Sequence, residues 1–306
     1  INKKIVFPLK MEISWTKLIG TSSYDEANAL TTGLDGSIYL TGSVSGDVDG
    51  QTYSGGIYDA FISKFNPDGS KDWTRLLGSS SSDYANALTT GSDGSIYIAG
   101  HTTNDLDGQT NSGDSDAFIS KFNPDGSKDW TRLLGSSRNE SPFGMTTASD
   151  GSIYLTGYTN GNLDGQTNFG DRDVFISKFN PDGSKDWTRL LGTSEIVGRA
   201  LTNGIDGSFY IAGNTNGNLD GQTNFGDSDA FISKLKDLTS NSEQIPVLEN
   251  ELDQDESVVI KPAAIWNIEP LRTASTAVDN LGFTEITGTS NNDTLNANAK
   301  NIVWGL

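Results

Sequence analysis

The feature that most constrains this chain is a unit of about 57 residues that occurs four times in tandem. A tryptophan marks each copy, at Trp15, Trp73, Trp130 and Trp187. The 14-residue segment Phe-Asn-Pro-Asp-Gly-Ser-Lys-Asp-Trp-Thr-Arg-Leu-Leu-Gly recurs without change, at 65–78, 122–135 and 179–192. Such repetition predicts a modular fold in which each copy forms one structural unit and packs on its neighbours.

Each repeat is expected to contain four short β-strands, which in the first copy are 27–32, 37–42, 60–65 and 73–77. The turn Asp35-Gly36 joins the first two strands, and the turn 66–69 (Asn-Pro-Asp-Gly) joins the last two. Proline supplies a φ near −65° in such a turn and glycine supplies a positive φ. Two hairpins make one four-stranded antiparallel sheet, which is the size and form of a β-propeller blade.

Other repeat architectures fit less well. Glycines interrupt every window that could form a helix, and 35 glycines with 34 % hydrophobic residues favour many short strands. A β-solenoid is the alternative architecture, but a solenoid does not need the paired hairpins that each repeat predicts. The repeated aromatic residues, such as Phe61, Phe65 and Trp73, are expected to pack between neighbouring sheets.

The two ends of the repeat region predict how the blades are arranged. The fourth copy has three strands, at 200–203, 208–213 and 230–235, and no Trp-bearing fourth strand follows. That strand is present at 13–19 instead. If it pairs with 230–235, the chain is an all-β, four-bladed propeller of four-stranded antiparallel blades, closed by the N-terminal strand. Otherwise the ring stays open and joins a second copy or belongs to a larger ring.

The expected organisation is an N-terminal extension at 1–12, a propeller at 13–236 and an irregular acidic tail at 237–306. The extension has two early lysines, but a proline and a lysine break its apolar patch, so it is a poor signal peptide. Within the tail, 237–257 reads as a linker, and 258–283 has enough apolar residues for a strand or two.

The repeat resembles the SBBP β-propeller repeat family, found in bacterial surface and secreted proteins. The segments that carry the resemblance are 35–42, 162–168, 173–179 and 182–187. The resemblance implies a binding or scaffold module outside the cell or on its surface, and it brings no catalytic residues. Residues 285–297 resemble one degenerate copy of the RTX calcium-binding nonapeptide, in which Asp293 and Leu295 match while Ser290 and Asn292 replace glycines. A polar end to the linker explains these residues equally well.

Net charge restricts the partners. The formal charge of −19 repels nucleic acid and anionic lipid, and no apolar run is long enough to cross a membrane. No cysteine is present, so disulfides and thiolate metal sites are excluded. The excess of carboxylates favours hard cations, above all Ca²⁺.

The loop between the second and third strands carries the candidate calcium ligands. Each copy has an Asn/Asp-x-Asp-Gly sequence followed by a returning aspartate, and these residues provide side-chain oxygens near glycine. They are Asp47, Asp49, Asp59, Asp105, Asp107, Asp114, Asp116, Asn162, Asp164, Asp171, Asp173, Asn218, Asp220, Asp227 and Asp229. The alternative is that they cap turns with their own backbone.

The segment before the first strand differs most between copies, and it is expected to lie near a mouth of the propeller channel. Its charged residues, Arg138, Glu140 and Arg199, predict a ligand-contacting rim, although tolerated loop variation also explains them. His101 is the only histidine, so histidine triads and multi-histidine metal sites are unavailable to this chain.

Three functions fit these observations. The leading one is a non-enzymatic extracellular or cell-surface module that binds a protein or a glycan and is stabilised by Ca²⁺. The second is a glycan hydrolase or lyase that works at the channel mouth with a pair of carboxylates. The third is a purely structural repeat.

Overall fold

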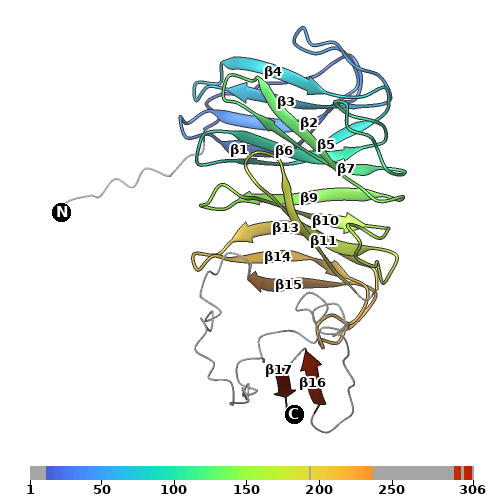
Figure 1. The fold of residues 1–306 in the computed structure, drawn as a ribbon. Coiled ribbons are helices and arrows are strands. Elements are labelled where there is room, and N and C mark those ends of the chain that lie inside the picture. Colours follow the sequence, from blue (N-terminus) through green and yellow to red (C-terminus); the bar gives the residue numbers. More distant parts are fainter. Residues whose placement is uncertain (1–11, 193, 237–292, 298–299, 305–306) are drawn as a thin grey trace, which may run out of the picture. The chain divides into compact units, whose positions relative to one another are not determined.

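The structure is a computed structural model that describes residues 12–192, 194–236, 293–297 and 300–304. These residues form strands and turns only. The chain divides into two compact parts, residues 1–240 and 241–306. In the first part, antiparallel sheets follow one another in chain order, as Figure 1 shows.

Two complete blades begin the array. Blade 1 contains β1 (Glu26–Thr32), β2 (Ile38–Val44), β3 (Asp59–Phe65) and β4 (Lys71–Leu77). Blade 2 contains β5 (Asp83–Thr90), β6 (Ile96–Thr102), β7 (Asp116–Phe122) and β8 (Lys128–Leu134). Within each blade the strands pair in sequence order, so the predicted double hairpin is confirmed.

The third blade is complete, whereas the described part of the fourth is shorter by one strand. Blade 3 contains β9 (Glu140–Thr147), β10 (Ile153–Thr159), β11 (Asp173–Phe179) and β12 (Lys185–Leu191). Blade 4 has three strands, β13 (Ile196–Asn203), β14 (Ser208–Thr215) and β15 (Asp229–Lys236). β15 pairs with β14 along one edge, and no described strand pairs with its other edge.

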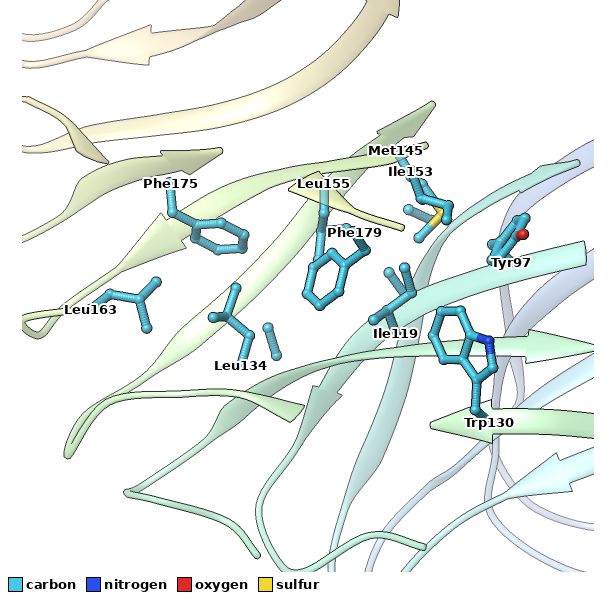
Figure 2. Packing of buried hydrophobic residues seen from close by; sticks show 13 residues of the cluster. Tyr97, Ile119, Trp130, Leu134, Met145, Ile153, Leu155, Leu163, Phe175 and Phe179 are labelled. Carbon is cyan, nitrogen blue, oxygen red and sulfur yellow. The ribbon is translucent and has the colours of Figure 1, made fainter. Parts of the chain in front are cut away.

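The core lies between the blades. Figure 2 shows the contact between blades 2 and 3, where Ile119 and Trp130 of one blade meet Leu155, Phe175 and Phe179 of the other. Similar clusters join blade 1 to blade 2 and blade 3 to blade 4. A sheet that is apolar on both faces needs a neighbour on each side, so the repeat itself requires stacking.

The repeated tryptophans fasten each blade to the next. The indole Nε1 of Trp73 donates a hydrogen bond to the carbonyl of Pro124 at 3.1 Å, and Trp130 does the same to Pro181 at 3.2 Å. The ring lies over the glycine of the same turn: a Cβ placed on Gly126 would come within 2.7 Å of Trp73. This close approach explains why glycine follows Pro-Asp in that turn.

The predicted pairing of 13–19 with the last blade is not confirmed. The segment has no strand pairing, and Trp15 donates to the carbonyl of Pro67 at 3.3 Å, so it contacts blade 1. The ends of the array stay open: Leu30 is 69 % exposed at the first blade and Ile232 is 74 % exposed at the last. Contacts with blade 1 hold the segment at the first end, away from β15.

The second compact part contains one described hairpin. β16 (Asp293–Ala297) pairs with β17 (Lys300–Trp304). Residues 293–297 are the end of the segment with RTX resemblance, whereas 285–292 and the predicted linker lie outside the described residues. Among the described residues, the structure contains no helix with the length and apolar character needed to cross a membrane.

Candidate functional site

The loop between the second and third strands contains a tight turn in every copy. Asp49 has φ of 51° and Gly50 has φ of 75°, and the Gln51 amide donates to the Val48 carbonyl at 2.8 Å. Two successive residues with positive φ define a type I′ turn, for which Asp-Gly is a preferred sequence. The copies Asp107, Asp164 and Asp220 have φ of 51°, 51° and 48°.

The carboxylates of these turns hold the fourth strand. Asp49 forms an ion pair with Lys71 and accepts a hydrogen bond from the Thr74 hydroxyl at 2.6 Å. Asp107 and Asp164 repeat this arrangement, with Lys128 and Thr131 and with Lys185 and Thr188. A lysine ammonium therefore stands where a calcium ion was expected.

Most of the other predicted ligands accept hydrogen bonds from backbone amides of the same loops. The side chain of the first Asp or Asn accepts a hydrogen bond from a backbone amide six residues later, as Asp47 does from Tyr53 at 2.8 Å. Asp105, Asn162 and Asn218 do the same. The returning aspartates Asp59, Asp116, Asp173 and Asp229 accept from a backbone amide within the loop. Asp114, Asp171 and Asp227 are exposed.

Most of these carboxylates contact protein groups. No group of three or more His, Cys, Asp or Glu side chains is gathered for a metal anywhere in the described part of the chain. The first Asp or Asn and the returning aspartate of each copy have the turn-stabilising geometry that was the alternative interpretation, whereas Asp114, Asp171 and Asp227 are exposed. Calcium binding at these loops stays a prediction from the sequence.

Pairs of buried acidic residues cross the contacts between blades, and their pairing was not predicted from the sequence. Asp59 lies near Asp83, and Asp116 lies near Glu140, with each side chain fully buried. Burial raises the pKa of Asp59 to about 6, and the Asp83 carboxylate contributes to the rise. Burial also raises the pKa of Asp83, Asp116 and Glu140. An acidic residue begins the first strand of blades 2 and 3, as Asp83 and Glu140, and this recurrence was the sequence signal for the pairs.

The three residues predicted to form a rim do not lie together. Glu140 is buried and accepts hydrogen bonds from Ser136 and Thr159, so its place on an exposed rim is corrected. Arg199 lies on β13, where its guanidinium stacks 5.0 Å from the centroid of the Phe143 ring. Only Arg138 is exposed beside a pocket.

A polar pocket lies where the segment before β9 meets the loop of blade 3. Its volume is about 460 Å³, and it is lined by Ser137, Arg138, Asn160, Gly161, Asn162, Asn168, Gly170 and Asp171. The Arg138 guanidinium makes no hydrogen bond to any described residue, whereas Asn160 donates to the Asp171 carbonyl at 2.6 Å. We call this the Arg138 pocket.

At the other two contacts between blades, the positions equivalent to the Arg138 pocket contain different side chains and different hydrogen bonds. Between blades 1 and 2, Asn104 donates to the Ser80 hydroxyl at 2.9 Å. Between blades 3 and 4, Glu195 accepts from Asn216 at 2.7 Å and forms an ion pair with Arg172. The Arg138 pocket therefore combines a cation that has no side-chain partner among the described residues with amide and hydroxyl groups, in a way that the repeat does not dictate.

Two polar residues away from this pocket have structural contacts. His101 stacks on Tyr84 with ring centroids 4.7 Å apart, and burial lowers its pKa to about 4. Asn86, from the neighbouring strand, donates to the Pro142 carbonyl at 3.0 Å. Asn86 therefore joins blade 2 to blade 3, whereas His101 stacks within blade 2.

Comparison with known proteins identifies the repeat. Residues 72–107 and 129–164 match the family model described as SBBP, beta-propeller repeat. Residues 91–131 match DUF5122, a beta-propeller domain of unknown function. The chain therefore carries β-propeller repeats, as its sequence pattern predicted.

A curated protein and several solved structures are similar to this chain. The regulatory protein FlaEY of Caulobacter vibrioides is 27 % identical over 184 residues, which are 54 % of this chain and 19 % of that protein. A protein of unknown function from Bacteroides caccae has a TM-score of 0.39 at 11 % identity, over 69 % of this chain and 61 % of its own. A glucose dehydrogenase has a TM-score of 0.31 at 10 % identity, over 70 % and 83 %. Scores this low carry no argument about fold or function.

Proposed function

We propose that this β-propeller repeat protein is a non-enzymatic binding module, and that the Arg138 pocket takes an uncharged, hydroxyl-rich ligand such as an oligosaccharide. The observation that carries the proposal is the unpaired Arg138 guanidinium beside amide groups in an open pocket. Guanidinium, amide and carboxylate groups together can donate to and accept from neighbouring sugar hydroxyls.

An exposed aromatic ring supports a sugar ligand. Phe169 lies between the pocket residues Asn168 and Gly170 and is 65 % exposed. An aromatic face beside polar groups can bind the apolar face of a sugar ring. The net charge of −19 disfavours acidic glycans, because the protein repels anions at long range.

We include a surface or extracellular location in this proposal. Such a location agrees with a glycan ligand and with the resemblance of the repeat to the SBBP family. The proposal does not include calcium, because most of the candidate ligands already have hydrogen bonds or ion pairs with protein groups. The following experiment also separates this proposal from the two alternative functions, a glycan hydrolase or lyase and a purely structural repeat.

Binding to an array of uncharged and acidic oligosaccharides tests the proposal, followed by titration calorimetry of the best uncharged ligand. Replacing Arg138 with glutamine should weaken binding about tenfold to a hundredfold, the loss expected for a charge-assisted hydrogen bond. Phe169→Ala should weaken it as well. Phe225→Ala is the matched control, because Phe225 has the same loop position in blade 4 and is exposed.

Three results would contradict the proposal. Absence of binding to every glycan would favour a structural repeat or a protein ligand. Unchanged affinity in Arg138→Gln would place the ligand elsewhere on the protein. Release of new reducing or unsaturated ends from a bound glycan would show an enzyme.

A further inference from the structure

Residues 13–19 have the position of a fourth strand that belongs to a blade before blade 1. Trp15 lies over Gly69 as Trp73 lies over Gly126: in both turns a Cβ on the glycine would come within 2.7 Å of the indole. Ile19 packs against the cluster of Val44 and Phe61 in blade 1. The segment therefore packs on blade 1 in the way that a fourth strand packs on the next blade, although it belongs to no described sheet.

The next residues repeat the same geometry. The Thr21 amide donates to the Asp25 carboxylate at 2.6 Å, and the Ser79 amide donates to Asp83 at 2.6 Å after the true fourth strand of blade 1. This agreement extends the match to residue 25. The backbone of 13–19 pairs with no described strand, so its hydrogen-bonding groups are free to join a sheet.

Among the described residues, blade 4 lacks this strand, but it keeps the side chains that bind the strand in blades 1 to 3. In blade 1 the Thr74 hydroxyl joins Ser63 at 2.7 Å and Asp49 at 2.6 Å. Blades 2 and 3 have the same trio. In blade 4, Ser233 and Asp220 are present without a threonine and line a groove of about 930 Å³ along β15. Thr16 holds the equivalent position in the N-terminal segment.

Apolar surfaces at the two ends of the array match in the same way. Ile232 is 74 % exposed, whereas its equivalents Ile62, Ile119 and Ile176 are buried against the following blade. Leu30 is 69 % exposed at the other end, whereas Met145 and Leu201 at the same position are buried against the preceding blade. Leu18, on the unpaired segment, is 94 % exposed.

The segment cannot reach β15 of its own chain in this open array. Residues 20–25 join it to β1, and six residues span at most about 20 Å. Three blade-to-blade spacings of about 10 Å each separate blade 1 from blade 4, or about 30 Å in all. In this open array a second copy can supply the strand that blade 4 lacks among the described residues.

We propose that residues 13–19 of one copy add to the free edge of β15 in a second copy. Trp15 stays on blade 1 of its own chain, while Thr16 joins Ser233 and Asp220 of the second. Leu18 lies opposite the second copy's Phe231, as Leu76 lies opposite Phe61. The contact is head-to-tail, so it continues from copy to copy unless the array closes into a ring.

Disulfide trapping tests this contact, because the natural chain has no cysteine. Thr16 and Ser233 should lie opposite each other on adjacent strands, as Thr74 and Ser63 do, at a distance that suits a disulfide. Under mild oxidation the variant Thr16→Cys/Ser233→Cys should form a ladder of covalent multimers. The control Thr16→Cys/Ser184→Cys, which moves the second cysteine to an exposed turn of blade 3, should not.

Two outcomes of this experiment overturn the proposal. A disulfide confined to single chains would show that the four blades close into a ring. Absence of a disulfide would show that another segment or partner covers β15, or that nothing does.

Sedimentation of the cysteine-free protein provides a second measurement. Ile232→Lys should weaken self-association about tenfold or more, since it places an ammonium in the apolar contact. Ile57→Lys is the matched control, because Ile57 is 63 % exposed in a loop of blade 1 away from both ends. A monomer at all concentrations, or equal weakening by both variants, contradicts the proposal.

Discussion

At the scale of single residues, acidic side chains have two opposite roles in this protein. Asp35 and Asp68 accept hydrogen bonds from serine two residues later, and these bonds lower the pKa of both groups. Asp59 and Asp83 are buried near each other, and burial raises their pKa. The difference arises from the environment, because all four are aspartates in repeated turns and strands.

Asp59 makes stability depend on pH. Its pKa is about 6 in the folded protein and 3.8 for an unperturbed aspartate, so the folded state holds the proton more tightly than the unfolded chain. The contribution of this group to stability is greatest below about pH 4 and is lost as pH rises through 6. Asp59→Asn should therefore raise the Tm at pH 7.5 by about 2–8 °C and change it little at pH 4.

Asp105→Asn is the control for this prediction. It removes the same charge from an exposed side chain, so it separates burial from the effect of net charge. Thermal unfolding of both variants at pH 4 and pH 7.5 provides the measurement. An equal rise in Tm for the two variants would show that burial of Asp59 has no special cost.

At the scale of elements, the Asp-Gly turn and the fourth strand depend on each other. Asp107 adopts a φ of 51° and accepts from Thr131 at 2.5 Å, so one residue both shapes the loop and binds β8. The alternation of short strands and turns was predictable from the sequence. The lysine partner was not, because Lys128 is 21 residues from Asp107 and only the sheet brings them together.

Replacing Asp107 with alanine should lower the Tm by about 2–8 °C, since it removes a hydrogen bond and leaves a residue that disfavours positive φ. The decrease should be the same with calcium and with chelator. Asp114→Ala, a change at an exposed aspartate of the same copy, should have little effect. A calcium-dependent rise in Tm that Asp107→Ala abolishes would restore the calcium hypothesis.

At the scale of the whole repeat region, stability should vary along the array. Blades 2 and 3 have a neighbour on each face, whereas the described residues leave blade 4 with a free edge and an exposed rear face. The Trp187 Nε1 is buried without a hydrogen-bond partner among the described residues, and the fourth repeat has Asp237 where the other turns have proline. Interfaces between neighbours provide much of the stability of repeat proteins.

Hydrogen exchange at low protein concentration should reveal this gradient. Amides of β14 should exchange at least about tenfold faster than the equivalent amides of β6 and β10. At high concentration the difference should decrease, because a second copy would cover β15. Uniform protection along the array at every concentration would indicate a closed ring.

The sequence by itself determined the unit of this fold. The spacing of Trp73 and Trp130, the Asp-Gly turns and the alternating apolar residues specify strand, hairpin and blade, because these depend on contacts within about 57 residues. Tertiary structure alone decided what the copies do together. It showed that Asp49 binds a lysine, that Glu140 is buried, and that Arg138 lies beside a pocket. Local patterns cannot specify these contacts, because each one joins residues from different strands or blades.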